Sequence, residues 1–312
     1  MAIYLAPAAL GLGDLVVTLP VVQQLIGRGE SVYLVVRAEE HVDLARRVPG
    51  IAGTRLEWEI PDCLGPGDRF LDLRDHPLEK VAWWGSKPWL EAYPGWTIND
   101  ILATICGDKG LRIDFDGGFV PLKFVRRPEL ADKVLLVPGS AVSAKMWDAA
   151  NWRQLAKSLD AVVLAASPNV VEALRPTAWY ETPTISDALD AVSSARAVIA
   201  VDTGIMHIAV HQGTPTVGIF RAFPVYAREC ENFVGVVATK PCEAVCYMRE
   251  IGCGHNGRPL AGKGFVPTDW SCLAGASEGR CMDTITTETV LAALEQATNR
   301  RGRHRQRTGT VL

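Results

Sequence analysis

Short, unbroken apolar runs alternate along the chain with longer segments in which apolar residues recur every three or four positions. Runs of the first kind predict strands buried on both faces of a parallel sheet, and segments of the second kind predict helices that cover the sheet. In the first part of the chain we expect strands at 3–6, 31–36 and 69–73, and helices at 15–26 and 41–48. This alternation indicates an α/β fold with a doubly wound sheet.

A second series of strands and helices begins after the polar segment 123–133, which Pro128 interrupts in the manner of a linker. The elements predicted in this series are strands at 134–137, 161–166, 198–201 and 214–220, and helices at 151–159, 187–194 and 205–212. A chain of 312 residues is long enough for two domains, because one domain usually takes about 100 to 200 residues. We therefore expect one domain at 1–125 and another at 134–285.

The last part of the chain combines an amphipathic segment with a basic one. The segment 286–299 begins with Thr286 and Thr287 as candidate helix caps, and its apolar residues fall on one helical face. The segment 300–312 begins with the basic run RRGRHRQR. Such a terminal run is more often a solvated tail than a contact site for acidic lipid or RNA. We expect a final helix followed by a basic tail.

The composition narrows the class of protein. Hydrophobic residues make up 48% of the chain and charged residues 21%, which is typical of a soluble globular protein. The net charge of −3 gives no argument for nucleic acid as a partner. No apolar run reaches the roughly 18 residues that a membrane span requires. We expect a cytoplasmic protein, and peripheral contact with the inner face of the cytoplasmic membrane is compatible with this expectation.

A glycine-rich turn with an aspartate follows the first predicted strand. Gly11, Gly13 and Asp14 stand in a loop of small residues, without the third glycine of the dinucleotide-binding fingerprint. Proline favours the first turn of a helix, so Pro20 predicts that the helix begins after Asp14. The Asp14 carboxylate suits two roles, a helix cap and a general base, and the residues alone leave both open.

The segment 198–220 has the pattern of a strand, a tight turn and a helix. Asp202 and Thr203 are common N-cap residues, and Gly204 allows the backbone to come close to a ligand. The backbone N–H groups and the dipole at such a helix N-terminus stabilise an anion such as a diphosphate. Similar turns occur in every α/β protein, so the spacing alone favours an ordinary connection over a ligand site.

Two polar or aromatic groups are candidates for contacts with a substrate. Arg74, Asp75 and His76 end the strand at 69–73 and could face a cleft, although an ordinary polar strand end is the simpler interpretation. The segment 83–96 holds four of the nine tryptophans, which suit sugar rings, lipid or packing beneath a loop equally well.

Candidate metal ligands occur at three places. His207 and His211 lie four residues apart on one helical face, but without a glutamate between them a packing role is more usual. Asp114 and Asp116 form a D-x-D motif, which at this length is a weak indication. A structural zinc is one interpretation of the cysteines near the C-terminus, and free or bridged thiols are the alternative. These cysteines are Cys242, Cys246, Cys253, Cys272 and Cys281.

Four motifs, in the same order as in the family, resemble the heptosyltransferases of glycosyltransferase family 9. The segment DTGIMHIAVHQGTPTVGIF at 202–220 is similar to the nucleotide-sugar-binding segment of that family. The N-terminal motif, G-x-G-D-x-x-x-T-x-P, is carried by Gly11, Gly13, Asp14, Thr18 and Pro20. The mid-chain motif, K-x-W-x-x-x-x-W, is carried by Lys145, Trp147 and Trp152. The C-terminal motif, C-M-x-x-I, is carried by Cys281, Met282 and Ile285.

The resemblance implies a GT-B fold, with two Rossmann-like domains facing each other across a cleft. It implies an inverting, metal-independent glycosyltransferase that needs no cofactor for catalysis. Asp14 would be the general base, in a loop with Gly11 and Gly13 on the acceptor side. The residues that the resemblance places at the donor are Ser140, Lys145, Asp202, Thr203, Gly204 and His207. The final helix would cross back to the first domain.

The implied partners are a nucleotide-sugar donor, such as ADP-heptose, and a glycan or glycolipid acceptor, as in lipopolysaccharide biosynthesis. Two features depart from the family. Arg221, Ala222 and Phe223 replace the usual G-P-T, and the first domain is short with a tryptophan-rich segment. A nucleotide-sugar epimerase of the same architecture and a catalytically inactive binding scaffold remain alternatives.

Overall fold

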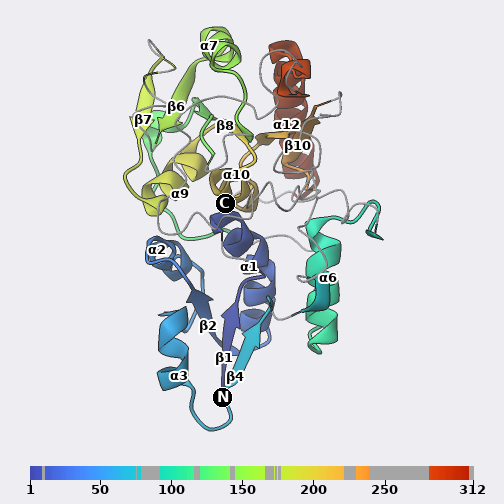
Figure 1. Ribbon diagram of the computed structural model, residues 1–312. Helices are drawn as coiled ribbons and strands as arrows, with labels where there is room; N and C mark the ends of the chain where they lie inside the picture. Colours follow the sequence, from blue (N-terminus) through green and yellow to red (C-terminus); the bar gives the residue numbers. More distant parts are fainter. Residues whose placement is uncertain are drawn as a thin grey trace.

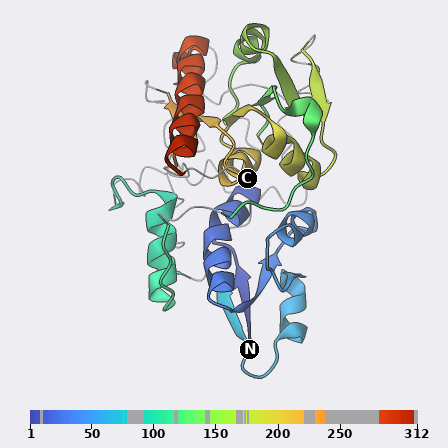
Figure 2. The same cartoon turned by 180° about the vertical axis from the view of Figure 1, so that it is seen from behind.

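Two parallel sheets, each covered by helices, form the molecule (Figure 1). The computed structural model describes residues 1–8, 11–74, 76–78, 92–115, 120–140, 145–165, 172, 174, 177–220, 230–238 and 281–308. In Figures 1 and 2 one sheet lies below the other, and helices α1 and α10 meet between them. None of the described helices combines the length and the hydropathy that a membrane-spanning helix needs.

The first sheet has the strand order β3-β2-β1-β4, and all its strands are parallel. Its strands are β1 (Ala2–Ala6), β2 (Ser31–Val36), β3 (Gly53–Leu56) and β4 (Arg69–Asp72). The helices of this part are α1 (Leu12–Gly27), α2 (Glu40–Arg46), α3 (Ile60–Cys63) and α6 (Ile98–Asp108), with the 3-10 helix η1 (Glu57–Glu59). The three strands predicted in this region are confirmed.

The second sheet has the order β10-β9-β8-β5-β6-β7 and is also parallel. Its strands are β5 (Val134–Val137), β6 (Ala161–Ala165), β7 (Trp179–Glu181), β8 (Ala197–Val201), β9 (Thr216–Phe220) and β10 (Phe233–Val237). Its helices are α7 (Ala149–Ser158), α9 (Ile185–Ser194), α10 (Gly204–His211) and α12 (Thr287–Thr308), with the 3-10 helices η2 (Pro128–Leu130) and η4 (Cys281–Thr284).

The strand order of the second sheet reverses between β5 and β8, as in a Rossmann fold. The chain runs from β5 outward through β6 to β7, and then returns to add β8, β9 and β10 on the other side. Ligands of open α/β sheets bind outside the carboxyl ends of the strands at such a reversal. In the first sheet the equivalent place lies between β1 and β4. The loops that follow β1, β5 and β8 therefore occupy the two positions where ligand sites are expected.

Burial explains the strands that the apolar runs predict. All five residues of β8 are completely buried, because helices cover both faces of the second sheet. On one face, Trp147 and Trp152 pack edge to face with ring centroids 5.4 Å apart. The Trp147 indole Nε1 donates a hydrogen bond to the Ile285 carbonyl oxygen at 3.1 Å. This bond fixes the segment before α12 against the core.

Two predictions about helices are wrong. Helix α1 begins at Leu12, not after Asp14, and holds Pro20 in its interior. Its first turn is closed by two bonds, because the Gly11 N–H donates to Asp14 Oδ2 at 3.0 Å and the Leu15 N–H donates to the Gly11 carbonyl at 3.1 Å. The residues from Leu15 to Val22 are all buried. That burial offsets the helix hydrogen bond that proline cannot make.

The final helix also differs from the prediction. Helix α12 runs on to Thr308, through most of the segment expected to be a basic tail. It packs on α7 and on strands β8, β9 and β10, so it covers the second sheet and does not cross back to the first (Figure 1). Val290, Ala293 and Ala297 on α12 belong to the same apolar core as Trp147. The apolar face of the helix is therefore already used on its own sheet.

Helices α1 and α10 lie against each other with no room for side chains at two glycines. A Cβ atom on Gly204 would come within 2.7 Å of Leu12 Cβ and Cγ, and one on Gly13 would come within 2.9 Å of His207 Cδ2. Real Cβ atoms do not approach other atoms so closely. Both glycines are therefore needed for the close contact between the helix that follows β1 and the helix that follows β8.

The segment between the sheets is held from both sides. Gln212, at the end of α10, bonds both the N–H and the carbonyl of Leu122, at 2.7 and 3.1 Å. The Lys123 N–H donates to the Arg47 carbonyl at 2.9 Å, and the Val125 N–H donates to Asp190 Oδ1 at 2.8 Å. The predicted linker at 123–133 thus overlaps a segment, 120–127, that bonds to both parts of the molecule.

We expect Gly204→Ala to lower the free energy of unfolding by about 1–3 kcal/mol, because the added methyl group overpacks the contact with Leu12. The matched control is Gly27→Ala, at the end of α1, where a Cβ atom meets nothing within 4 Å. Alanine there should be neutral or stabilise by about 0.5–1 kcal/mol. Thermal and urea unfolding of both variants measure the difference, and equal stabilities would contradict the tight contact.

Candidate functional site

Asp14 lies in the first turn of α1, beside the contact with α10. The turn follows β1, so the carboxyl group stands at the carboxyl edge of the first sheet. Its Oδ2 accepts the Gly11 N–H at 3.0 Å, and its main-chain carbonyl accepts the Thr18 hydroxyl at 2.8 Å. The sequence left open whether Asp14 is a helix cap or a base. The carboxyl group does cap α1, and its surroundings decide what else it can do.

Three charged or polar side chains from the second sheet's edge form a buried group next to α1. Lys145 Nζ lies 2.6 Å from Asp202 Oδ2, and His207 Nε2 lies 3.8 Å from Asp202 Oδ1. The side chains of Asp202 and His207 are less than a tenth exposed, and that of Lys145 is 15% exposed. Lys145 comes from the loop after β5, whereas Asp202 directly follows β8 and His207 lies in α10. The group therefore sits at the chain reversal of the second sheet.

The two aspartates have opposite electrostatic environments. Burial raises the pKa of Asp14, and the Gly11 N–H, His207 and Lys145 lower it only in part, while Asp202 raises it further. Burial also acts to raise the pKa of Asp202, but Lys145 and His207 overcome it and hold that pKa far below its usual value. Asp202 is a permanent carboxylate, and Asp14 has the higher proton affinity. Such a pair, close together but with separated pKa values, is typical of a catalytic site.

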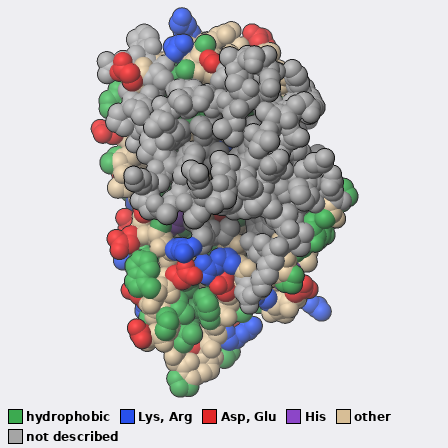
Figure 3. Space-filling view, viewed as in Figure 1, with side chains coloured by type: hydrophobic (Ala, Val, Ile, Leu, Met, Phe, Trp, Pro, Cys, Tyr) green, Lys and Arg blue, Asp and Glu red, His purple; other side chains and the backbone are tan. Residues whose placement is uncertain are grey.

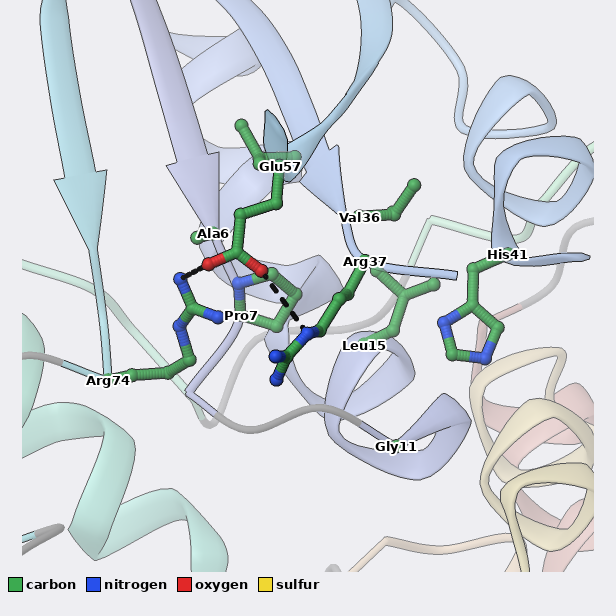
Figure 4. Close-up of a pocket in the computed structure, with 10 residues that line it drawn as sticks. Ala6, Pro7, Gly11, Leu15, Val36, Arg37, His41, Glu57 and Arg74 are labelled. Atoms are coloured by element: carbon green, nitrogen blue, oxygen red, sulfur yellow. Dashed lines mark hydrogen bonds and ion pairs between the residues drawn. The ribbon is translucent and has the colours of Figure 1, made fainter. Parts of the chain in front are cut away.

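A hollow opens beside Asp14 at the carboxyl edge of the first sheet (Figure 4). Its enclosed space is about 20 Å³, and its lining residues lie at or just after the ends of all four strands of that sheet. Three charged side chains line it, and Figure 4 shows Glu57 between Arg74 and Arg37. Gly11 and Leu15, which flank Asp14 in α1, also line it. The remaining lining residues are Ala6, Pro7, Val35, Val36 and His41.

Most of the predicted site residues come together at this junction. Gly11, Gly13 and Asp14 meet the buried group formed by Lys145, Asp202 and His207, and Gly204 contacts α1. Thr203 is the N-cap of α10 but makes no side-chain cap bond, and Ser140 follows β5 in the same edge of the sheet. The interpretation of Arg74 as an ordinary strand end is incomplete, since Arg74 lines the hollow.

Several other candidates have different surroundings. His211 Nε2 lies 3.1 Å from the Val120 carbonyl, so this histidine holds the segment between the sheets. The Asp114 N–H donates a hydrogen bond to Gln24 Oε1 at 2.9 Å. Asp75, Asp116, most of the segment 83–96 and residues 221–223 lie outside the described residues, as do Cys242, Cys246, Cys253 and Cys272. Cys281 begins η4. Within the described residues, no group of three or more His, Cys, Asp or Glu side chains is arranged to hold a metal ion.

Sequence reasoning missed Arg37, His41 and Glu57. They belong to no motif, and each is common on protein surfaces. Their shared property is position, because each follows the end of a strand of the first sheet. Arg37 comes directly after β2 and Glu57 directly after β3, a strand that the sequence pattern did not predict. Correct prediction of β3 would have placed Glu57 at the ligand-binding edge.

Comparison with known proteins gives a family match for part of the chain and a fold for the whole. Residues 125–227 match the sequence model of glycosyltransferase family 9 (heptosyltransferase). No curated protein matches the chain. A solved glycosyltransferase family 9 structure from Veillonella parvula is similar over 96% of this chain and 97% of its own, at 14% identity and a TM-score of 0.64.

Two Escherichia coli structures are also similar. The glycosyltransferase TibC, described as iron-containing and dodecameric, matches 96% of this chain and 76% of its own, at 14% identity and a TM-score of 0.61. Heptosyltransferase WaaC with ADP matches 76% of this chain and 93% of its own, at 12% identity and a TM-score of 0.56. The predicted GT-B architecture, with two Rossmann-like units, is confirmed. The chain therefore has the GT-B fold of these solved structures, and its residues 125–227 carry a sequence match to glycosyltransferase family 9.

Proposed function

We propose that this protein transfers a sugar from a nucleotide diphosphate to a hydroxyl group of an acceptor, with inversion at the anomeric carbon. The observation that supports it best is the position of Asp14. A carboxyl group with a raised pKa, carried by the first sheet, lies within the electrostatic reach of Lys145, Asp202 and His207 of the second. A base from one unit thus stands beside the cationic group of the other.

The donor diphosphate is proposed to bind at the N-terminus of α10. The first N–H groups of a helix have no partner within it, and the helix dipole favours an anion there. Gly204 keeps this end free of a side chain, and Thr203 and Ser140 add hydroxyl groups nearby. Lys145, beside Asp202, supplies a full positive charge. Related structures contain ADP and ADP-heptose, which supports ADP-heptose or a similar nucleotide-sugar as donor.

In the proposed reaction Asp14 accepts the proton of the acceptor hydroxyl as its oxygen attacks the anomeric carbon. The new C–O bond forms on the face opposite the diphosphate, and the bond from carbon to the diphosphate oxygen breaks with its electron pair. One displacement inverts the configuration. Lys145 and the α10 N-terminus stabilise the negative charge that develops on the leaving group, so these groups take the role that a metal ion has in other transferases. The acceptor is proposed to be a glycan or glycolipid.

Asp14→Asn should lower kcat by a factor of about 10²–10⁴, the usual contribution of a general base. Asparagine keeps an oxygen that accepts the Gly11 N–H, so α1 stays capped and nucleotide binding is retained. The control is Asp62→Asn, because Asp62 is an exposed carboxylate in the same part of the chain. Initial rates of nucleotide release and thermal shifts with ADP measure the two effects. Full turnover in Asp14→Asn would remove Asp14 from the mechanism.

Lys145→Met should weaken ADP binding and move the acid limb of the pH profile of kcat/KM to higher pH. The limb reports deprotonation of Asp14, and activity is present above its pKa and lost as the pH falls through it. Lys145 lowers the pKa of Asp14 directly, and it also neutralises the charge of Asp202, which raises that pKa. Loss of the lysine therefore raises the pKa of Asp14 through both effects. Lys133→Met is the control, since Lys133 forms an ion pair of the same length, 2.6 Å, with exposed Asp160. An unchanged limb would show that Lys145 does not act on the base.

A chelator should leave turnover unchanged, because Lys145 and α10 supply the positive charge at the leaving group. The measurement is the initial rate before and after dialysis against EDTA, with circular dichroism as a check on folding. A large loss of rate in protein that stays folded, restored by a divalent cation, would show that a metal takes part. Loss of rate together with unfolding would instead indicate a structural metal, such as the zinc predicted for the cysteines.

A further inference from the structure

The connecting segment, residues 120–127, is bound by both units where it passes between the two sheets (Figure 2). Gln23 Nε2 of α1 donates to the Val120 carbonyl oxygen at 2.5 Å, and His211 Nε2 of α10 lies 3.1 Å from the same oxygen. One main-chain carbonyl group thus joins the two helices that meet at the candidate site. The segment is therefore part of the contact between the units.

Asp190 is a buried aspartate beside this segment. It lies in α9, where its neighbours Leu189 and Ala191 are also buried, and only 3% of its side chain is exposed. Asp190 Oδ1 accepts the Val125 N–H at 2.8 Å, and Oδ2 lies 3.1 Å from a terminal nitrogen of Arg127. These two partners, both from the connecting segment, offset the cost of burying the carboxylate.

A third partner of Asp190 comes from the first unit. Arg47, directly after α2, places Nη1 3.9 Å from Asp190 Oδ1, and its own carbonyl oxygen accepts the Lys123 N–H at 2.9 Å. At 3.9 Å the guanidinium group attracts the carboxylate without a direct hydrogen bond. Helices α2 and α9 also pack against each other. Asp190 therefore connects the second unit both to the connecting segment and to the end of α2.

Burial distinguishes this carboxylate from the exposed ion pairs of the protein. Figure 3 shows Lys and Arg side chains next to Asp and Glu side chains on the surface of the first unit, and exposed pairs contribute little to stability. Arg46 and Asp43 form an exposed pair at 3.5 Å, with side chains that are 70% and 59% exposed. The charge of Asp190 is shielded from water, so the loss of a partner leaves it uncompensated.

Two helix pairs connect the units, and they lie side by side (Figures 1 and 2). At the candidate site α1 packs on α10 through Gly13 and Gly204, and next to it α2 packs on α9. One helix contact alone leaves the units free to rotate about it, whereas a second contact to one side fixes the angle between them. Because α9 also packs on α10, the second contact is connected to the helix that carries His207.

We propose that Asp190 is a positioning residue for the transfer reaction: together with Arg47 and the connecting segment it forms a brace that fixes the angle between the units. Helices α1 and α10 are the pivot, and the brace holds Asp14 at its place beside Lys145. The inference rests on the proposed function, because the angle matters for transfer only if a base on one unit acts on a donor held by the other. Asp190 itself touches neither substrate.

Two variants loosen the brace from opposite units. Arg47→Met removes the cation of the first unit but keeps an unbranched side chain and the main-chain bond to Lys123. Asp190→Asn keeps an oxygen for the Val125 N–H and loses the negative charge. Since a displacement of about 1 Å can cost about a hundredfold in rate, we expect kcat to fall about threefold in Arg47→Met and about tenfold or more in Asp190→Asn. ADP binding should not change, because the groups proposed to bind ADP belong to the second unit.

Hydrogen exchange followed by mass spectrometry tests the brace without any turnover. In both variants the amides of the first turn of α1, such as that of Leu15, which bonds the Gly11 carbonyl, should exchange about tenfold faster through local opening. Helix α6 lies on the side of the first unit away from α2 (Figure 1), so its amides should exchange as in the wild type. This contrast separates a loosened brace from a general loss of stability.

The pH profile of kcat/KM gives a readout that a merely structural role of Asp190 would not move. Burial is the main cause that raises the pKa of Asp14. Among the weaker influences, the Gly11 N–H, His207 and Lys145 lower this pKa, and Asp202 raises it. A loosened brace admits water to the Asp14 carboxyl group, so its pKa falls and the acid limb moves to lower pH. The shift is opposite in sign to the one expected for Lys145→Met.

The control variant is Arg46→Met, because Arg46 is the residue before Arg47 and pairs with Asp43 inside the first unit. It should equal the wild type in kcat, in hydrogen exchange and in the pH profile. The double variant of Arg47 and Asp190 should be no slower than Asp190→Asn alone, because both substitutions break the same link. If Asp190→Asn does not fold, Arg47→Met and its control carry the test.

Three results would each overturn the brace: wild-type kcat in the variants that fold, independent losses that multiply in the double variant, or faster exchange spread evenly over the molecule. Failure of the proposed function has a different signature, because the wild-type enzyme itself would then transfer no sugar. In that case the exchange of α1 relative to α6 still decides whether Asp190 and Arg47 fix the angle between the units.

Discussion

The close contact between α1 and α10 is the constraint on which the site depends. These two helices follow β1 and β8, so each begins at the ligand-binding edge of its own sheet. Only the absence of side chains at Gly13 and Gly204 lets their first turns meet. The contact joins the apolar cores of both units, since one buried cluster includes residues of α1, α10 and both sheets. A shift of one helix would therefore disturb the core as well as the position of Asp14.

The same contact gives two nearby carboxyl groups different properties. Asp202 has the cationic and hydrogen-bonding partners, Lys145 and His207, and these keep it ionised. Asp14 has one backbone N–H as its direct hydrogen-bond donor among the described contacts, and burial raises its pKa. A carboxylate that is fully satisfied is a poor base, and one that is buried with few donors is a better one. The unequal number of partners thus separates the ionised Asp202 from Asp14, the carboxylate proposed as the base.

The sequence predicted the buried parts of the fold better than the exposed parts. Strands β2, β5 and β8 are apolar runs with no polar interruption, so their limits could be read within a residue or so. Strand β3 is half-buried throughout, and its residues, GTRL, have no apolar run to detect. Pro20 misled the prediction of α1, because local preference for a first turn was weaker than the burial of the residues around it. The motifs named the residues that are proposed to bind the donor, but the pairing of these residues, such as Lys145 with Asp202, depends on the fold alone.

The first turn of α1 connects two places of opposite electrostatic character. On one side, the described charged side chains of the hollow, Glu57, Arg37 and Arg74, form ion pairs with one another, and Arg74 also pairs with Asp72 behind them. On the other side, Lys145 and the N-terminus of α10 offer positive charge where a diphosphate is proposed to leave. If both sides were cationic, an anionic leaving group would have a second place to bind. The paired charges of the hollow remove that competition, so the separation of charge across one helical turn favours an anion on the α10 side of Asp14 only.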